Sequence, residues 1–276
     1  MGRAVASADA ASPGKSVTER AFAVLMSFDM GHRQMTLSQI SRRSGLPVAT
    51  TFRLLNHLEA MSAVQRDPAG RYAIGPKIWE LGILAPTHDV IGMGTRPLLL
   101  RLATKSGMMV RVFVYNGEQA LCVEEVLANG ASAPGSGPGM TLPLGDSAAG
   151  HILMAGMSPA ARSALPLTRA QFTRVEESIA AAAERGWARR SDAAGHLEYA
   201  VPIRAEGRPP MALSLSTPPT ASGAPRPGAS IEAMIPELRG AARSLAAILA
   251  SASDSSASQA PGTDAAPRTT EKGGQP

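Results

Sequence analysis

Apolar residues recur at helical spacing on both sides of a short turn in the N-terminal quarter of the chain. Leu37 and Ile40 lie one helical turn apart before it. After it, a repeat at i, i+3, i+4 and i+7 predicts one buried stripe, which consists of Thr51, Leu54, Leu55 and Leu58. Gly45 can adopt the positive φ of a helix C-cap, and Pro47 suits the first helical position because no N–H is needed there. The pattern predicts two helices joined by a tight turn.

The second of these helices leaves an outward face that is small, polar or cationic near its start. This face consists of Val48, Ala49, Thr50, Phe52, Arg53 and Asn56. Such a face suits a helix that enters a DNA major groove. Thr36, the expected N-cap of the first helix, and Pro47 complete the predicted contact residues of this hairpin. The alternative is an ordinary helical hairpin packed in a core, and this stretch alone leaves both interpretations open.

A further helix is predicted before this pair. Ser16 and Glu19 form a Ser-x-x-Glu capping box, and the helix should end near Met30 and Gly31. The face expected to pack under the hairpin consists of Val17, Ala21, Val24, Leu25 and Phe28.

A short β-hairpin is predicted after the helices. Alternating positions within 64–74 flank a turn at Asp67–Gly70. The order helix, helix, turn, helix, hairpin is that of a winged helix-turn-helix. Residues 16–74 hold seven arginines and four acidic residues, which suits a polyanion. Arg66 and Arg71 on the hairpin could contact phosphates or a minor groove, or each could be a solvated surface charge.

Composition limits the classes of protein that fit. The chain of 276 residues is 44% hydrophobic, enough for a packed core, and carries a net charge of +5. Cys122 is the single cysteine, which excludes an internal disulfide framework. We find no signal-peptide h-region and no run of about 18 apolar residues, so we expect a soluble cytoplasmic protein without membrane contact. Residues 1–15 and 251–276 are rich in small and polar residues and are expected to be disordered.

Helices and strands are mixed through the rest of the chain. Helices are expected at residues 77–84, 97–106 and 231–250, after a loop at 142–147, and as segments within 158–186. Strands are expected at residues 110–114, 121–126, 187–188, 199–203 and 211–216. Asn116-Gly117 is a type I′ turn signal between the first two strands, and 130–140 is a flexible run. The mixture predicts an antiparallel sheet with helices.

Several motifs together resemble the DNA-binding half of IclR-family transcription regulators. They are, in the family's order, the SVTERA opening, the Gly-Leu-Pro turn, the Thr-x-x-Arg-Leu-Leu helix and the Arg-Tyr-x-Ile-Gly-Pro exit from the hairpin. The resemblance covers about Ser16 to Ala250, and it is strongest in the first 65 residues of that range.

The start of the recognition helix departs from the family pattern. It usually begins Pro-Lys-Ser-Thr, whereas this chain has Val48 and Ala49 in place of the cation and the hydroxyl. The departure implies that Val48, Ala49 and Phe52 contact thymine methyl groups, with Thr50 and Arg53 as polar readers of bases.

The resemblance implies an α+β chain with an N-terminal winged helix-turn-helix. A linker helix joins it to a GAF-like antiparallel-sheet effector-binding domain. The implied divisions are a disordered segment 1–15, a DNA-binding domain 16–75, a linker helix 76–92, an effector-binding domain 93–250 and a disordered tail 251–276. Because the family's linker helix contributes to dimer contacts, we expect a homodimer or a dimer of dimers on double-stranded DNA.

In the family, a small ligand is held by a loop before a helix and by two serines on a late strand. The loop and helix resemble Leu142–His151, so the N–H groups of Ala148 and Ala149 are expected to bind a carboxylate at a helix N-terminus. The serine pair resembles Ser214 and Ser216, whose hydroxyls point the same way along a strand. The alternative is two hydroxyls bonded to neighbouring backbone.

Two further ligand positions depart from the family. An Asp and a Cys of the family pattern fall at Arg190 and Glu198, which would add a cation and an acid to the pocket. Arg189 or Arg190 could then clamp a ligand carboxylate through two hydrogen bonds. An Arg190–Glu198 surface pair, or Arg189 in solvent, is an equal alternative.

The sequence therefore predicts a DNA-binding transcription regulator controlled by a small-molecule effector, expected to be an organic acid, with no catalytic residue, metal or cofactor. One alternative is a regulator of the same fold that has no ligand and acts through protein partners. A remote alternative is a serine hydrolase, because Gly145-Asp146-Ser147 lies close to His151. Against it, Ser147 suits a helix N-cap, and no acid is placed to orient His151.

Overall fold

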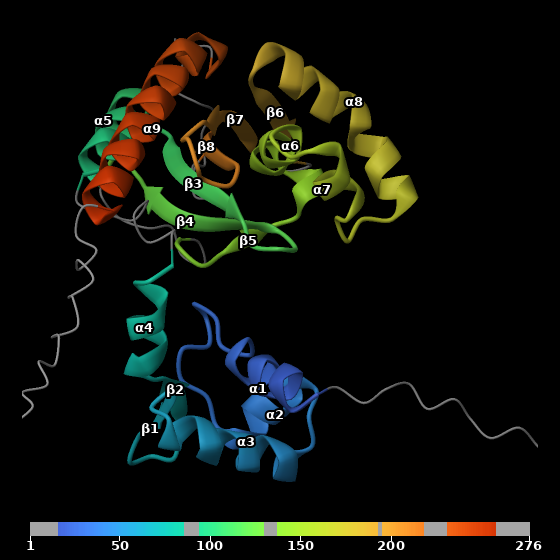
Figure 1. Cartoon of the computed structure of the whole chain (residues 1–276), viewed down its shortest axis with the longest axis vertical. Helices are drawn as coiled ribbons and strands as arrows, with labels where there is room; N and C mark the ends of the chain where they lie inside the picture. The colour runs from blue at the N-terminus through green and yellow to red at the C-terminus, as the bar shows by residue number, and fades with distance from the viewer. Residues whose placement is uncertain (1–15, 86–93, 130–136, 193–194, 218–230, 258–276) are drawn as a thin grey trace, which may run out of the picture.

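The computed structural model describes residues 16–85, 94–129, 137–192, 195–217 and 231–257 (Figure 1). A small N-terminal unit and a larger C-terminal unit are visible, and helix α4 (Pro76–Gly82) stands between them in Figure 1. The expectations for residues 1–15, for the linker helix beyond residue 85, for most of the run 130–140 and for the tail after residue 257 lie outside the described residues.

The N-terminal unit has the predicted order of helices followed by a hairpin. Its elements are α1 (Val17–Leu25), α2 (Leu37–Ser44), α3 (Val48–Ala60), β1 (Val64–Arg66) and β2 (Tyr72–Ile74). The two strands pair antiparallel, with Arg66 opposite Tyr72. Met35 adds an isolated bridge to Tyr72 through backbone hydrogen bonds of 2.9 and 2.7 Å, which the sequence pattern did not predict. The arrangement is a winged helix-turn-helix.

Local sequence signals fix the ends of these helices. Ser16 and Glu19 form the predicted capping box of α1, and Thr36 with Gln39 forms a second one at α2. Gly45 ends α2 with a φ of 69°, which the absence of a Cβ allows. The core under the helices consists of Val24, Met35, Ile40, Leu54, Leu55, Leu58, Ala63, Val64 and Tyr72.

The extent of α1 was predicted wrongly. The helix ends at Leu25, and Val17 is 64% exposed rather than packed under the hairpin. The Ser27 hydroxyl donates to the Val24 carbonyl, and Arg43 Nε donates to the Ser27 carbonyl. These bonds turn the chain out of the helix, although the apolar periodicity continues.

The start of α3 was also misplaced by one residue. Pro47 is the N-cap, with a ψ of 144°, and the helix begins at Val48. The predicted stripe of α3 is nevertheless buried, because the shift concerns only the residue before the first turn.

The C-terminal unit is built on one sheet in the order β5-β4-β3-β8-β7-β6, with antiparallel pairing throughout. Its strands are β3 (Met109–Tyr115), β4 (Ala120–Val126), β5 (Thr141–Leu142), β6 (Ala188–Ser191), β7 (Leu197–Ile203) and β8 (Met211–Ser216). Its helices are α5 (Arg96–Ser106), η2 (Leu144–Asp146), α6 (Ala148–Ala155), α7 (Pro159–Ser163), α8 (Arg169–Arg185), η3 (Ile231–Met234) and α9 (Ile235–Ala257). The last helix therefore passes residue 250, where disorder was predicted.

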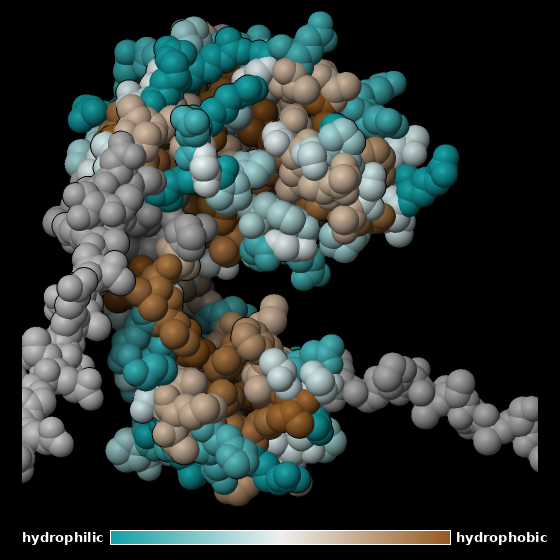
Figure 2. Space-filling model, viewed as in Figure 1, coloured by the Kyte–Doolittle hydropathy of each residue, from teal (hydrophilic) through white to brown (hydrophobic). Residues whose placement is uncertain are grey.

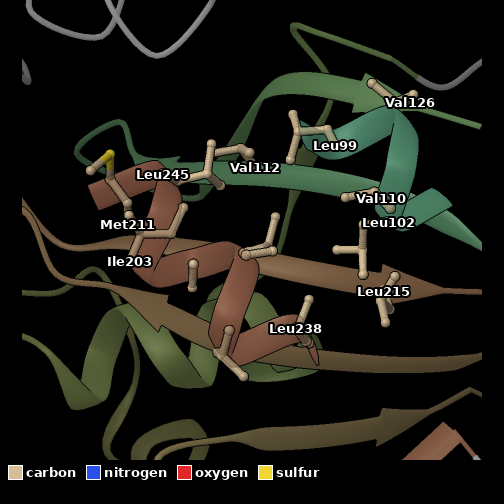
Figure 3. Close-up of a cluster of buried hydrophobic side chains, with 14 of the residues drawn as sticks. Leu99, Leu102, Val110, Val112, Val126, Ile203, Met211, Leu215, Leu238 and Leu245 are labelled. Atoms are coloured by element: carbon tan, nitrogen blue, oxygen red, sulfur yellow. The ribbon is translucent and has the colours of Figure 1, made fainter. Parts of the chain in front are cut away.

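Helices cover both faces of this sheet. Helices α5 and α9 cover one face, where Leu99, Val112 and Leu245 belong to a continuous apolar core (Figure 3). Helices α6 and α8 cover the other, where Phe113 and Ile179 belong to a second core. The chain is α+β, as predicted. Polar side chains of the central strands that face α6 are consequently shielded from water.

The connection between β3 and β4 is longer than predicted. Tyr115 pairs with Ala120, so four residues form the loop instead of the two of a type I′ turn. Gly117 has a φ of 101°, whereas Asn116 is not in the left-handed region. The Asn116 side chain accepts hydrogen bonds of 3.0 and 2.8 Å from the two N–H groups after Gly117, which stabilises the wider turn.

Candidate DNA interface and effector pocket

Helix α3 presents the predicted contact face to solvent while its other side closes the core. The exposed members of the predicted set are Pro47, Val48, Ala49, Phe52, Arg53 and Asn56, and Thr50 is half-buried. Val48 is 50% and Phe52 is 42% exposed. Apolar side chains this exposed on a helix flanked by cations suit contact with the thymine methyls of a major groove.

The remaining predicted contact residues are held in defined positions. The Arg66 guanidinium lies 5.3 Å from the centroid of the Tyr72 ring. Arg71 Nε donates to Asp67 Oδ2 at 2.9 Å. Hydrogen bonds from Arg71, first from its backbone N–H, hold the pKa of Asp67 below its usual value. The Thr36 hydroxyl is engaged in capping α2.

One arginine of the basic set is structural. Arg43 Nε donates to the Ser27 carbonyl at 2.7 Å, and its guanidinium pairs with Asp29. The pKa of Asp29 is lowered, chiefly by a hydrogen bond with His32 and further by the Arg43 charge. Arg43 therefore ties α2 to the turn after α1.

The predicted effector residues meet on the face of the sheet that α6 covers. Glu198 in β7 lies opposite Ser216 in β8 and opposite Arg190 in β6. Ser214 precedes Ser216 by two residues, so both hydroxyls are on this face. A cavity of about 370 Å³ is lined by Arg190, Glu198 and Ser216, but not by Ser214. A larger cavity, of about 580 Å³, lies beside the β7–β8 turn and holds none of the predicted residues.

Glu198 occupies the start of α6. The Ala148 N–H donates to Glu198 Oε2 at 2.7 Å, so the expectation that this N–H is open to a ligand carboxylate is wrong. Burial raises the pKa of Glu198, while the N–H groups of Ala148 and Ala149 and the Arg111 guanidinium act in the opposite direction. The Ser214 hydroxyl also lowers this pKa by its proximity. It does not reach hydrogen-bond geometry, however, and the buried Glu198 Oε1 has no partner among the described residues.

Arg190 turns away from Glu198 although the two are cross-strand neighbours. Its Nη2 lies 3.4 Å from Asp146 Oδ1, and its buried Nε has no partner in the described part of the chain. The alternative of an Arg190–Glu198 pair is wrong, because α6 holds the Glu198 carboxyl. Arg189 lies on the other face of the strand, with its guanidinium 5.9 Å from the centroid of the Tyr199 ring.

A buried ion pair that the sequence analysis missed lies next to the serines. Arg111 Nε donates to Glu125 Oε2 at 2.8 Å, and the two side chains are 9% and 0% exposed. Arg111 lies opposite Ser214, and an irregularity at Val112/Phe113 shifts the register of β4. A charged residue between two buried valines of one strand is the signal that could have revealed this pair.

The geometry opposes the serine hydrolase alternative. Ser147 Oγ accepts from the Gly150 N–H at 3.0 Å and donates to the Pro143 carbonyl at 2.9 Å. His151 Nε2 lies 3.0 Å from the Gly145 carbonyl, and burial lowers the pKa of His151, so the ring is neutral and donates there. Both side chains hold η2 against α6, and neither is free to act as nucleophile or base.

Other chemistry finds little support in the described residues. They contain no group of three His, Cys, Asp or Glu side chains that could hold a metal ion. Burial raises the pKa of Cys122 to about 12, so its thiol stays protonated at neutral pH. Within the same residues, every helix is too short or too polar to cross a lipid bilayer.

The N-terminal fold defines a class of protein. A winged helix-turn-helix whose second hairpin helix has an exposed face is the architecture of a DNA-binding domain. Residues 17–68 match the model of the IclR helix-turn-helix domain. This segment is an IclR-type helix-turn-helix domain.

Known proteins agree with this assignment. The HTH-type transcriptional regulator XynR of Escherichia coli (strain K12) is 27% identical over 72% of this chain and 84% of its own length. The HTH-type transcriptional repressor AllR of the same strain is 31% identical over 52% of this chain and 54% of its own. An IclR homolog from Microbacterium hydrocarbonoxydans, solved in complex with 4-hydroxybenzoate, has the same fold, with a TM-score of 0.67 and 23% identity over 86% of this chain and all of that one. The two Escherichia coli relatives are transcriptional regulators.

Proposed function

We propose that a small-molecule effector bound in the cavity beside Arg190 controls how this regulator binds its operator. The observation that carries the proposal is a set of buried polar atoms beside that cavity. Arg190 Nε, Glu198 Oε1 and Ser216 Oγ have no hydrogen-bond partner within the described residues. Buried polar groups in folded proteins are almost always paired, so a ligand that supplies partners would be favoured here.

An organic acid suits the cation of this cavity. Arg190 Nε and Nη groups can bind a carboxylate through two parallel hydrogen bonds, and its contact with Asp146 is long at 3.4 Å. The Microbacterium hydrocarbonoxydans homolog was solved with a hydroxylated aromatic acid. A similar acid is a reasonable first probe for this chain. An effector changes DNA affinity only as far as it binds the two arrangements of the protein differently.

We expect Arg190→Ala to weaken binding of a carboxylate effector about 10- to 100-fold, because a charge-assisted hydrogen bond is lost. The measurement is the melting temperature of the full chain, titrated with 4-hydroxybenzoate and other aromatic acids. Arg189→Ala is the matched control, since that guanidinium lies over Tyr199 on the other face. If the ligand raises the melting temperature of Arg190→Ala as much as that of the native chain, Arg190 does not bind the ligand carboxylate. If no acid shifts either the melting temperature or the DNA affinity of the native chain, the alternative of a regulator without a ligand that acts through protein partners is favoured.

For the DNA side, we propose that α3 lies in the major groove and the β1–β2 hairpin lies on the backbone. Val48, Ala49 and Phe52 would contact thymine methyls, while Arg53 would reach a base edge. Support comes from the exposure of this face and from the rigid attachment of α3 to the core of the domain.

We further propose that α4 contributes to a homodimer or a dimer of dimers. Large apolar side chains of α4 and of the two residues that follow it are exposed, and Figure 2 shows a brown surface over this segment. Leu84 is 75% exposed, and the others are Trp79, Leu81 and Ile83. Contiguous exposed apolar surface marks interaction sites, and two half-sites of an operator need two recognition helices about one DNA turn apart.

Leu84→Glu is expected to weaken the dimer at least about 10-fold, because a carboxylate would be buried in an apolar contact. Sedimentation equilibrium without DNA measures the dissociation constant of the dimer. Val48→Glu introduces the same charge at an exposed apolar position of α3, and its dissociation constant should match that of the native chain. Equal dissociation constants for both variants would contradict a role of α4 in the dimer.

A further inference from the structure

The first N–H groups of α6 are all turned to acceptors of the chain itself. Ala148 N–H donates to Glu198 Oε2 at 2.7 Å, and the Ala149 N–H lies close enough to lower the pKa of the same carboxyl. The Gly150 N–H donates to the N-cap hydroxyl of Ser147 at 3.0 Å. Such N–H groups, at the positive end of the helix dipole, are a favourable position for a carboxyl group.

The carboxyl that fills this position comes from a distant strand. Glu198 lies 50 residues after Ala148, and its place is set by pairing of β7 with β8, which puts it opposite Ser216. Three buried oxygen atoms have no partner in the described residues here, namely Glu198 Oε1, Ser214 Oγ and Ser216 Oγ. Ser214 is 0% and Ser216 is 7% exposed. The carboxyl therefore uses one oxygen to bind α6 and leaves the other among unsatisfied hydroxyls.

We infer that Glu198 is an internal carboxyl ligand of α6: its carboxyl group occupies the position that the carboxylate of an effector would otherwise take. The pocket consequently selects effectors that present a hydroxyl to β7 and β8. A hydroxyl both donates and accepts, so it can pair with Glu198 Oε1 in either protonation state and with Ser216 Oγ. The acid group of such an effector would then face Arg190, at the other side of the cavity. The selection of hydroxylated effectors rests on the proposed function, whereas the binding of the Glu198 carboxyl group to the N-terminus of α6 does not.

The direct test removes the internal carboxyl and offers a free one. In Glu198→Ala, we expect formate or acetate to raise the melting temperature by about 2–4 °C in a saturable way, because a ligand that binds the folded state stabilises it. Chloride at equal ionic strength and uncharged acetamide should have no such effect. The native chain and Glu198→Gln, whose amide fills the same space, should not respond to either acid.

Two results would overturn the inference. One is a native chain that responds to formate as strongly as Glu198→Ala does, and the other is a folded Glu198→Ala that does not respond at all. If Glu198→Ala does not fold in chloride, the same comparison is made with Glu198→Ser. Recovery of a cooperative melting transition in formate but not in chloride supports the inference, and its absence in both variants contradicts it.

A second arm tests the selection of the effector. Benzoate and 4-hydroxybenzoate differ by one hydroxyl, and we expect the native chain to bind the hydroxylated acid about 10-fold more tightly, with the difference lost in Glu198→Ala. Equal affinities in the native chain contradict the selection. Binding of neither acid, together with a formate response of Glu198→Ala, would reject the effector proposal and leave the occupation of α6 standing.

Discussion

Replacement of Gly150 by alanine should destabilise the C-terminal unit by about 3 kcal/mol or more, because backbone would have to move to accept the new methyl group. A Cβ at this position would lie 2.6 Å from the Leu144 Cα and closer still to the Leu144 carbonyl oxygen. Leu144 belongs to η2, which His151 holds through the Gly145 carbonyl. Neither backbone can retreat without loss of these bonds, and the first turn of α6 would shift relative to Glu198.

Chemical denaturation of the full chain measures this effect. Gly82→Ala is the control, because no atom lies within 4 Å of its Cβ position and Gly82 is helical. We expect that variant to be unchanged, or more stable by about 0.5–1 kcal/mol. A Gly150→Ala variant within about 0.5 kcal/mol of the native chain would show that α6 does not pack this closely on η2.

Arg53→Ala should weaken binding to the operator by about 1–3 kcal/mol, or roughly 5- to 150-fold, if Arg53 reads a base. The side chain is exposed on α3, and the stripe of Leu54, Leu55 and Leu58 behind it is buried. The domain should therefore keep its stability, and the loss should appear as reduced discrimination at one base pair.

Titration of operator variants at two salt concentrations distinguishes the two possible contacts of Arg53. A uniform loss across sequences with a shallower salt dependence would make it a phosphate contact. Arg101→Ala, an exposed arginine of α5, is the control and should bind as the native chain does. Native affinity and discrimination in Arg53→Ala would place α3 away from the bases.

Features set by neighbours in sequence could be predicted. The caps at Ser16, Thr36 and Gly45 follow from local hydrogen-bonding capacity and from glycine's tolerance of positive φ. The buried stripe of α3 follows from the helical period alone. These signals need no knowledge of the rest of the chain, which is why the winged helix-turn-helix was the more secure part of the prediction.

Features set by tertiary contacts could not be predicted. α1 ends early because Arg43, from the next helix, binds the carbonyl of Ser27. The family resemblance predicted Glu198 as a ligand contact, but nothing in the sequence indicated that its carboxyl binds the Ala148 N–H 50 residues away. The buried partner of Arg111 depends on an irregular register in β4, which has no marker in composition.

The proposed function depends above all on the binding of a specific duplex by α3. The most direct measurement is the affinity of the purified full chain for DNA flanking its own gene, in the presence of excess random duplex and with or without candidate acids. We expect one segment to be bound at least about 1,000-fold more tightly than random sequence, with an affinity that changes when an effective acid is added. Equal affinity for all duplexes under every condition would contradict the account.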